Sequence, residues 1–327
     1  MAVRDLKYGF GTHATNLCSA LADQGVETSL FVGQNDYVMA QLGRYLSNDY
    51  KDHDLLHVHG TPYLVCKQPI PTVVTVHSTV RSELLHNLWR PKFWVGRVVE
   101  KLAMLSPDAF IAVNSCLIDD ILYDRSDADI TVIPNGVYPE EFDQFMWTEP
   151  KENYILTGGR LVKRKRFLDV FKARDGLDTE TKIILFGDGP DFRKFQRIKR
   201  GTDYLVGWVE RDGLIGLYLN ARMFVSPSSY EAGPLTVLEA MAARCPVISS
   251  DIPAVKDMIT NGETGLLYPV GDIEKLSEQI KTLIEDPELG IKLAENAHEY
   301  VRVHHNWADV AKATIGVYEM LLGRSRK

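Results

Sequence analysis

Two glutamates in the second half of the chain have a spacing that could serve a polar ligand. Glu231 and Glu239 have seven residues between them, and the apolar-periodic segment from Leu235 onwards predicts a helix that starts between them. A helix start offers backbone N–H groups and the positive end of a dipole to an anion. Carboxylates on either side of such a site suit a ligand whose hydroxyl groups flank a diphosphate. Taken alone, the pair is better explained by a helix cap at Glu231 and a solvated helix residue at Glu239.

The residues around the two glutamates predict a strand, a helix and a second strand. Residues 223–226 are a short apolar run, which Pro-Ser-Ser at 227–229 interrupts. Pro234 suits the first turn of a helix over residues 235–243, and Pro-Val-Ile-Ser-Ser at 246–250 starts the next strand. This order is typical of a parallel sheet.

The composition is that of a cytoplasmic globular protein with room for two domains. The chain has 327 residues, 45% of them hydrophobic and 25% charged, and its formal net charge of −7 argues against nucleic acid as a partner. Four cysteines, at positions 18, 66, 116 and 245, are too scattered for a zinc site or a disulfide framework and fit a reducing compartment. Neither a transmembrane helix nor a signal peptide is expected.

Histidines follow the apolar runs of the first half. Residues 55–60 and 72–77 read as buried parallel strands, and His77 ends the second of them. Ligands of open α/β sheets bind at the carboxyl ends of the strands, although a histidine satisfied by the backbone explains His77 equally well. His57 and His59 could form a metal pair, but alternation along a strand is the better explanation, and no metal site is expected. Earlier, Gly9-Phe-Gly11 predicts a glycine loop before a helix over residues 12–23, with a strand over residues 26–32.

Basic and aromatic residues interleave between positions 86 and 105. The simpler interpretation is a helix packed through Val95, Val98, Val99 and Leu102 with a solvated basic face. The alternative is contact with anionic lipid or with a phosphorylated acceptor.

The second half opens with a strand, two glycines and five basic residues in the seven positions 160–166. Taken alone, the basic run is a surface feature. A Gly-Asp-Gly-Pro turn follows at 187–190, and residues 204–209 read as a further strand and loop.

Together these motifs resemble the retaining GT-B glycosyltransferases of group 1 and family four, a superfamily that includes glycogen synthase-like and mannosyltransferase-like enzymes. The match is most specific over residues 224–267, where Glu231, seven residues and Glu239 are followed by Ala-Met-Ala, Pro-Val-Ile and Asn-Gly-Glu-Thr-Gly-Leu-Leu. Residues 131–137, 160–165 and 187–190 also match the family. The chain departs from the family at three positions where glycine is usual, namely Ala232, Arg166 and either Arg244 or Cys245.

The resemblance implies specific roles. Glu231 would contact hydroxyls of the transferred sugar and Glu239 those of the ribose, His77 would contact the donor sugar, and Arg160 and Lys165 would hold the donor diphosphate. The catalytic residues would thus be Glu231, His77, Arg160 and Lys165. The donor-binding positions would be Gly9, Gly11, Gly159, Gly207, Val209, Ala232, Gly233, Pro234, Leu235, Thr236 and Glu239.

The resemblance also implies the architecture and the partners. The expected fold is α/β of the GT-B type, with two doubly wound Rossmann-like parallel-sheet domains facing across a cleft. The expected domains are residues 1–146 on the acceptor side, residues 147–305 for the nucleotide-sugar donor, and a helix over residues 306–327 that crosses back to the first domain. The polar stretch at 138–150 would be the linker. The donor would be a nucleotide-diphosphate sugar and the acceptor a glycan, a lipid-linked or a small molecule. Peripheral contact with the inner face of the membrane stays open, as does the oligomeric state.

No cofactor and no metal is expected. Asp127-Ala-Asp129 has the spacing of a cation-binding pair, but it precedes the strand predicted from Ile130 and so lies at the wrong end of it. Three alternative functions are a sugar-nucleotide epimerase, an inactive nucleotide-sugar binding subunit and an NAD-dependent oxidoreductase. The oxidoreductase lacks its ribose-binding carboxylate, since Gly33-Gln-Asn follows the strand where an acidic residue is needed.

Overall fold

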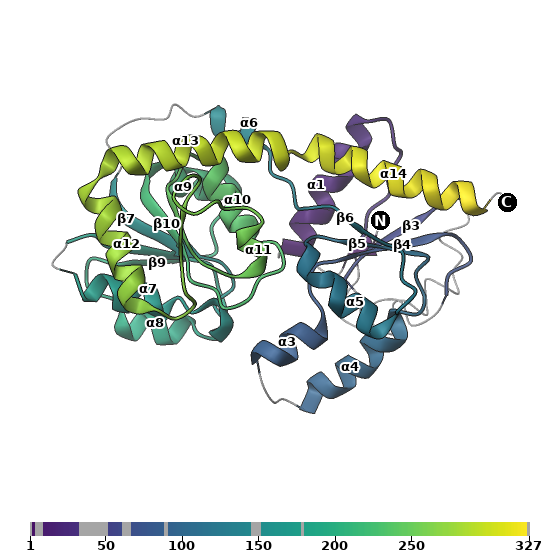
Figure 1. Cartoon of the computed structure of the whole chain (residues 1–327), viewed down its shortest axis with the longest axis horizontal. Coiled ribbons are helices and arrows are strands. Elements are labelled where there is room, and N and C mark those ends of the chain that lie inside the picture. Colours follow the sequence, from purple (N-terminus) through teal and green to yellow (C-terminus); the bar gives the residue numbers. More distant parts are fainter. Residues whose placement is uncertain are drawn as a thin grey trace. The chain divides into compact units, whose positions relative to one another are not determined.

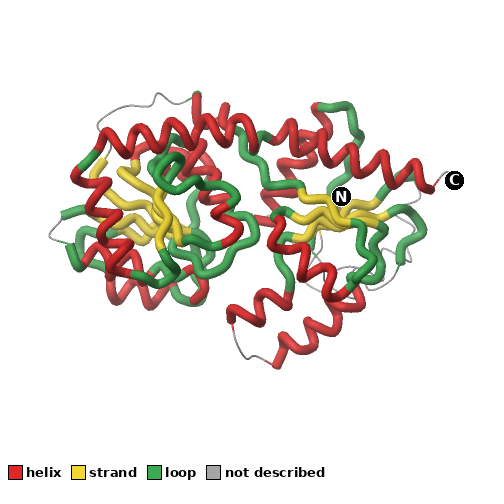
Figure 2. Tube along the Cα trace, viewed as in Figure 1, coloured by secondary structure: helices red, strands yellow, loops and turns green. Residues whose placement is uncertain are grey.

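The computed structural model describes residues 2–3, 9–32, 52–60, 67–87, 91–144, 152–177 and 180–325. They form two α/β units, drawn in Figures 1 and 2. Unit 1 comprises Met1–Gly136 and Trp307–Lys327, and unit 2 comprises Val137–Asn306.

Unit 1 contains a six-stranded sheet of parallel strands in the order β2-β1-β3-β4-β5-β6. Its strands are β1 (Ala2–Val3), β2 (Phe31–Val32), β3 (Leu56–His59), β4 (Thr72–Val76), β5 (Ala109–Ala112) and β6 (Ile130–Val132). Its helices are α1 (Gly9–Asp23), α3 (Val80–Asn87), α4 (Pro91–Ala103), η2 (Ser115–Leu117), α5 (Ile118–Asp124) and α14 (Trp307–Ser325). The last helix, α14, packs against α1, where the Gln24 side chain donates to the Ala308 carbonyl over 2.7 Å.

Unit 2 contains a second six-stranded parallel sheet, in the order β12-β11-β10-β7-β8-β9. Its strands are β7 (Glu152–Gly158), β8 (Lys182–Phe186), β9 (Tyr204–Gly207), β10 (Ala221–Ser226), β11 (Val247–Ser250) and β12 (Leu266–Tyr268). Its helices are α6 (Pro139–Asp143), η3 (Lys163–Lys165), α7 (Leu168–Asp175), α8 (Phe192–Ile198), α9 (Arg211–Asn220), α10 (Leu235–Ala242), α11 (Pro253–Lys256), α12 (Ile273–Glu285) and α13 (Pro287–His304).

Side-chain alternation along the strands of unit 2 divides its core between the two faces of the sheet. Tyr154 and Leu156 of β7 pack in a cluster with residues of α9 and α10, whereas Ile155 packs in a second cluster with residues of α7 and α12. Helices therefore cover both faces, as a doubly wound sheet requires.

Both sheets reverse their winding direction at one point. In unit 2 the chain runs from β7 through β8 to β9 on one side, and β10 then pairs with the other side of β7. In unit 1 the corresponding point lies between β1 and β3. The crevice at the carboxyl ends of the strands beside such a switch point is where doubly wound sheets bind ligands.

Some local expectations need correction. Of the strand predicted over residues 26–32, only Phe31–Val32 pairs with the sheet. The predicted linker contains α6, whose Glu141 binds Arg211 of the same unit, so the contacts divide the chain at Gly136 rather than at residue 146. A helix of five residues is too short to show the periodic apolar pattern from which helices are predicted, so it could not be predicted from the sequence.

Candidate functional site

The switch point of unit 2 brings two of the predicted catalytic residues into contact. Lys165 ends the short helix η3 that follows β7, and Glu231 lies in the loop between β10 and α10. Because β7 and β10 are neighbouring strands, these loops meet at the carboxyl edge of the sheet. Lys165 Nζ lies 2.6 Å from Glu231 Oε1.

A second cation completes this cluster. Arg164 Nη1 lies 3.6 Å from Glu231 Oε2, and all three side chains are largely buried, with 10% of Glu231 exposed. Burial would raise the pKa of the Glu231 carboxyl, but Lys165 and Arg164 outweigh it and hold that pKa below its ordinary value. Glu231 is therefore ionised at neutral pH, and the cluster carries one net positive charge.

Further hydrogen bonds fasten the two loops together. The backbone N–H and the hydroxyl of Ser229 both donate to the Arg164 carbonyl, over 2.9 and 3.1 Å. Arg164 Nη1 in turn donates to the Tyr230 carbonyl over 3.0 Å. The carboxylate and its cations are thus positioned by the protein itself, before any ligand binds.

The backbone of the Gly-Asp-Gly-Pro turn at 187–190 packs against the loop that follows β7. Gly187 has a φ of +103°, and a Cβ there would lie 1.9 Å from the Gly159 carbonyl oxygen. The Leu161 N–H donates to the Asp188 carbonyl over 2.8 Å, and the Gly187 N–H donates to Gly207 over 2.6 Å. Only glycine permits so close an approach of two backbone segments. The backbone of Gly187 thus lies against both Gly159 and Gly207, which are two of the predicted donor-binding positions.

Glu239 is bound to an arginine that the sequence did not single out. Arg211 Nη1 lies 2.5 Å from Glu239 Oε1, and the Tyr218 hydroxyl donates to Glu239 Oε2 over 3.2 Å. Arg211 also contacts Glu141 Oε2 over 2.5 Å. Burial raises the pKa of Glu239, and Arg211 offsets this only in part. Glu239 is 13% exposed, so it is not the solvated helix residue of the simpler interpretation.

Glu231 is likewise not a helix cap. The residue that caps α10 is Pro234, and no side chain accepts a hydrogen bond there. The other predicted donor positions surround the start of this helix: Ala232 and Pro234 are buried, whereas Gly233, Leu235 and Thr236 are half-buried. Val209 follows β9 and is half-buried, and Arg160 is exposed in the loop after β7.

Two of the departures from the family pattern share one backbone property. Among the described residues, Arg166 and Arg244 are the non-glycine residues with positive φ, at 51° and 50°. Glycine is usual at both positions because the left-handed conformation is strained for other residues. Each arginine also forms an ion pair, Arg166 with Asp169 at 2.7 Å and Arg244 with Asp143 at 2.6 Å. Ala232 stays outside the left-handed region and needs no glycine.

The switch point of unit 1 holds a cluster of histidines. His59 ends β3, His77 follows β4, and His13 lies on α1. His59 Nδ1 lies 3.1 Å from His77 Nε2, and the His13 ring meets the His77 ring edge-on at 4.5 Å. The glycines Gly9 and Gly11 form the first turn of α1 rather than a loop before it.

In a fourth histidine, His57, both ring nitrogens lie within hydrogen-bond distance of hydroxyl groups. His57 stacks on His59 at 4.6 Å, and its two nitrogens lie 2.6 Å from the hydroxyls of Tyr318 and Thr75. Burial lowers the pKa of His57 and of His77 to about 3 and lowers the pKa of His13 and of His59 well below the ordinary value. All four rings are neutral at neutral pH.

Three of these rings could hold a metal ion. His13, His59 and His77 each offer a nitrogen within 4.8 Å of the other two, and neutral imidazole is a common metal ligand. His13 Nδ1 and His59 Nε2 are buried without a hydrogen-bond partner in the described part of the chain. From the sequence, His57 and His59 were the residues considered as a metal pair. The local pattern gave no sign of His13, because His13 lies far from His59 and His77 along the chain.

The Asp127-Ala-Asp129 motif lies where the sequence predicted. It precedes β6, and Asp127 is exposed beside Arg125, whereas Asp129 pairs with Arg324 at 2.5 Å. It therefore stands at the amino end of its strand, away from the ligand edge of the sheet.

Comparisons with known proteins agree with this picture. Residues 140–300 match the model of the glycosyl transferases group 1, and residues 35–141 match that of glycosyltransferase family 4. A glycogen synthase of Mycobacterium tuberculosis is 29% identical over 287 residues, covering 81% of this chain and 67% of the relative. An N-acetyl-alpha-D-glucosaminyl L-malate synthase of Bacillus anthracis is 26% identical over 76% of this chain and 70% of its own length.

Solved structures share the fold at lower identity. A sucrose-phosphate synthase from Thermosynechococcus elongatus superposes with a TM-score of 0.80 at 19% identity, covering 99% of this chain and 98% of the other. The Anabaena protein HepE, solved in complex with UDP-glucose, gives a TM-score of 0.81 at 16% identity, and the match covers 98% of this chain and 100% of HepE.

Proposed function

This chain belongs to the group 1 glycosyltransferases and has the GT-B fold, and from that premise we propose that it transfers a sugar from a nucleotide-diphosphate donor with retention of anomeric configuration. The acceptor in this proposal is a glycan, a lipid-linked or a small molecule. A cytoplasmic location, which the scattered cysteines favour, belongs to the same proposal.

The observation that carries the proposal is the contact between Glu231 and Lys165 at the switch point of unit 2. A carboxylate held ionised by two cations combines acceptors that suit sugar hydroxyls with positive charge that suits a diphosphate. The fold alone does not explain why Glu231 and Lys165 lie at the ligand edge of the sheet, because a buried ion pair that only stabilised the protein would not need that position. HepE binds UDP and UDP-glucose, which is consistent with a nucleotide-sugar donor for a chain of the same fold.

In the proposed reaction the bond between the sugar C1 and the diphosphate oxygen breaks, and its electron pair leaves with the diphosphate. The acceptor hydroxyl attacks C1 from the same face and gives its proton to the departing diphosphate. Lys165 and Arg160 neutralise the charge that develops on the leaving group, and Glu231 orients the sugar hydroxyls. No protein nucleophile is needed for this route.

His77 and Glu239 supply the remaining contacts in this scheme. The neutral His77 ring would meet the donor sugar, and Glu239 the ribose hydroxyls. Since Arg211 already occupies one oxygen of Glu239, a ribose would bind through the oxygen that Tyr218 contacts or would displace Arg211.

A screen of donors tests the proposal first. The melting temperature of the chain is measured with UDP, GDP, ADP and CMP sugars, because a bound ligand raises apparent stability. We expect one nucleotide class to stabilise the protein and to be hydrolysed slowly without an acceptor. The anomeric configuration of the product, read by NMR, then tests retention. Stabilisation with no donor hydrolysis and no transfer would instead favour an inactive binding protein.

A further inference from the structure

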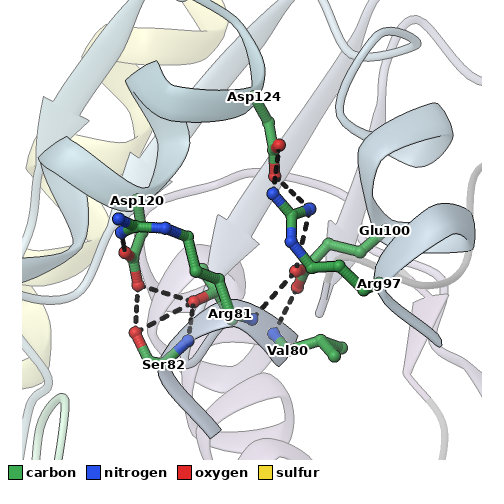
Figure 3. Close-up of polar contacts among 8 residues, drawn as sticks. Val80, Arg81, Ser82, Arg97, Glu100, Asp120 and Asp124 are labelled. Carbon is green, nitrogen blue, oxygen red and sulfur yellow. Dashed lines mark hydrogen bonds and ion pairs between the residues drawn. The ribbon is translucent and has the colours of Figure 1, made fainter. Parts of the chain in front are cut away.

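Two buried aspartates on α5 of unit 1 take no part in the proposed reaction. Asp120 and Asp124 lie four residues apart on one side of the helix, and both are buried. Each is bound to an arginine of a neighbouring helix, Asp120 to Arg81 of α3 and Asp124 to Arg97 of α4. Figure 3 shows the two contacts. A buried carboxylate is costly unless it is paired in this way, and the two aspartates differ in what else they hold.

Asp120 binds three side chains from the turn after β4 and the first turn of α3. Thr79 Oγ1 donates to Asp120 Oδ2 over 2.6 Å, and the Ser82 hydroxyl donates to the same oxygen. Arg81 donates to the other oxygen, Oδ1. The Thr79 hydroxyl also accepts from the Ser82 N–H over 3.0 Å, as the residue before a helix commonly does. One carboxylate on α5 therefore fixes both the turn and the helix that follows it.

A second buried carboxylate holds the backbone of the same helix. Glu100 of α4 is fully buried and accepts from the N–H groups of Val80 and Arg81, over 2.6 and 3.3 Å. The first N–H groups of a helix have no partner within it, so Glu100 satisfies donors that the helix itself leaves unpaired. Glu100 thus keeps α3 in place even without Asp120. What Asp120 adds is its contact with the side chain of Thr79.

The side of α4 that lies opposite Glu100 is apolar and exposed. Val98 and Leu102 are 61% and 48% exposed, so the expectation that they pack into the core is wrong. Residues 88–90, between α3 and α4, lie outside the described residues. No helix among the described ones is both long and apolar enough to cross a membrane. Contact of this basic and aromatic segment with lipid stays a prediction.

The turn that Asp120 holds begins directly after His77. The strand β4 pairs with β5 as far as Val76, so His77 lies beyond the last paired residue. Only Ser78 separates His77 from Thr79, whose hydroxyl is bound to Asp120. The direction of the His77 ring therefore depends on the path of this turn as well as on the sheet. A displacement of about 1 Å at a reacting centre can cost about 100-fold in rate.

We propose that Asp120 is a positioning residue for the transfer reaction, which fixes the turn after β4 through Thr79 and thereby directs the ring of His77. This role rests on the function proposed above, in which His77 meets the donor sugar. Asp124 provides the comparison, because its carboxylate accepts from Arg97 of α4, over 2.7 and 2.5 Å, rather than from the turn after His77.

A double-mutant cycle with His77 tests the proposal. The kcat and the donor KM are measured for His77→Ala, for Asp120→Ala and for the double variant. We expect Asp120→Ala to lower kcat by about tenfold to hundredfold, with the donor KM within about threefold of the wild type. In the His77→Ala background the same change should lower kcat by less than about threefold, because two residues that act through one contact are not additive. Melting temperatures show that each variant is folded at the assay temperature.

Three further variants sharpen the cycle. Asp120→Asn keeps an oxygen that can accept from Thr79 and should keep kcat within about fivefold of the wild type. Thr79→Val removes the hydroxyl at nearly the same volume and should couple to His77→Ala as Asp120→Ala does, so it carries the test if Asp120→Ala does not fold. Asp124→Ala is the matched control, since it removes a buried carboxylate one turn further along α5. It should lower the melting temperature and keep kcat within about threefold.

The possible outcomes separate this role from the proposed function. Losses in kcat that add in the cycle, or an Asp124→Ala variant as slow as Asp120→Ala, would show that Asp120 only stabilises unit 1. The positioning role is also overturned if His77→Ala is slow while Asp120→Ala and Thr79→Val keep the wild-type kcat, and the proposed function then stands. If His77→Ala itself keeps the wild-type kcat, the proposed role of His77 is refuted, and the role of Asp120 falls with it.

Discussion

Replacement of Lys165 by alanine tests how the proposed site handles the charge of the leaving diphosphate. Lys165 Nζ lies 2.6 Å from Glu231, and its side chain is 12% exposed, so water substitutes poorly for the lost ammonium group. Loss of one preorganised charge-stabilising contact costs about 2–4 kcal/mol in a transition state. We therefore expect kcat/KM for the donor to fall by about 30-fold to 1000-fold.

The same change also affects folding, and by a smaller amount. Arg164 remains 3.6 Å from the Glu231 carboxylate, so this buried charge keeps one partner. We expect the free energy of unfolding, measured with urea, to fall by about 1–3 kcal/mol, less than the full cost of breaking a buried pair. The protein stays folded, and the loss of activity is not a loss of structure.

Lys163 provides the control within the same short helix. It is exposed two positions before Lys165, and Lys163→Ala should keep kcat/KM within about threefold of the wild type. The reasoning is refuted if Lys165→Ala keeps wild-type kcat/KM, or if Lys163→Ala loses as much as Lys165→Ala does.

Four further predictions follow from other contacts. Glu231→Gln should destabilise the protein at neutral pH, because the pKa of the Glu231 carboxyl is lowered in the folded state. The difference should be fully present above the unfolded glutamate pKa of about 4.3, shrink as the pH falls through that value and vanish below the lowered folded-state pKa; a pH-independent difference in urea unfolding would contradict this. Excess EDTA should leave transfer nearly intact, whereas activity lost to EDTA and restored by Zn²⁺ or Mn²⁺ would point to the histidine cluster instead. His77→Ala should lower turnover strongly with little change in melting temperature, and an unfolded variant would favour a core role. Arg244→Gly should leave the free energy of unfolding unchanged or raise it by about 1 kcal/mol, whereas Arg244→Val should lower it by about 1–2 kcal/mol, since only glycine relieves the left-handed backbone. Equal urea midpoints for the two variants would count against this.

Much of the fold could be predicted from local patterns. The continuous apolar runs around His77 and before Glu231 are buried parallel strands, as the sequence indicated, because a strand covered by helices on both faces needs no polar alternation. The contact of Glu231 with Lys165 follows from the same pattern. Residues after the carboxyl ends of neighbouring parallel strands meet at one edge, even when they are far apart along the chain.

What the sequence did not predict depends on long-range pairing. Nothing in the local pattern joins Arg211 to Glu239, or His13 to His59, because each pair forms only after the strands between them take their places in the sheet. The orientation of α4 was predicted wrongly for a related reason. Apolar periodicity shows that Val98 and Leu102 share one side of a helix, but Arg97 and Glu100 decide which side turns inward through partners on α3 and α5.

The crystal structure of the chain with the nucleotide-diphosphate sugar identified by the donor screen would test the central claim most directly. The measured quantities are the distances from the donor to Lys165 Nζ and to the Glu231 carboxylate. We predict that a diphosphate oxygen lies within hydrogen-bond distance of Lys165 and a hydroxyl of the transferred sugar within hydrogen-bond distance of Glu231. A donor bound elsewhere in the chain, with the contact between Lys165 and Glu231 unchanged and no donor atom near either group, would contradict the account.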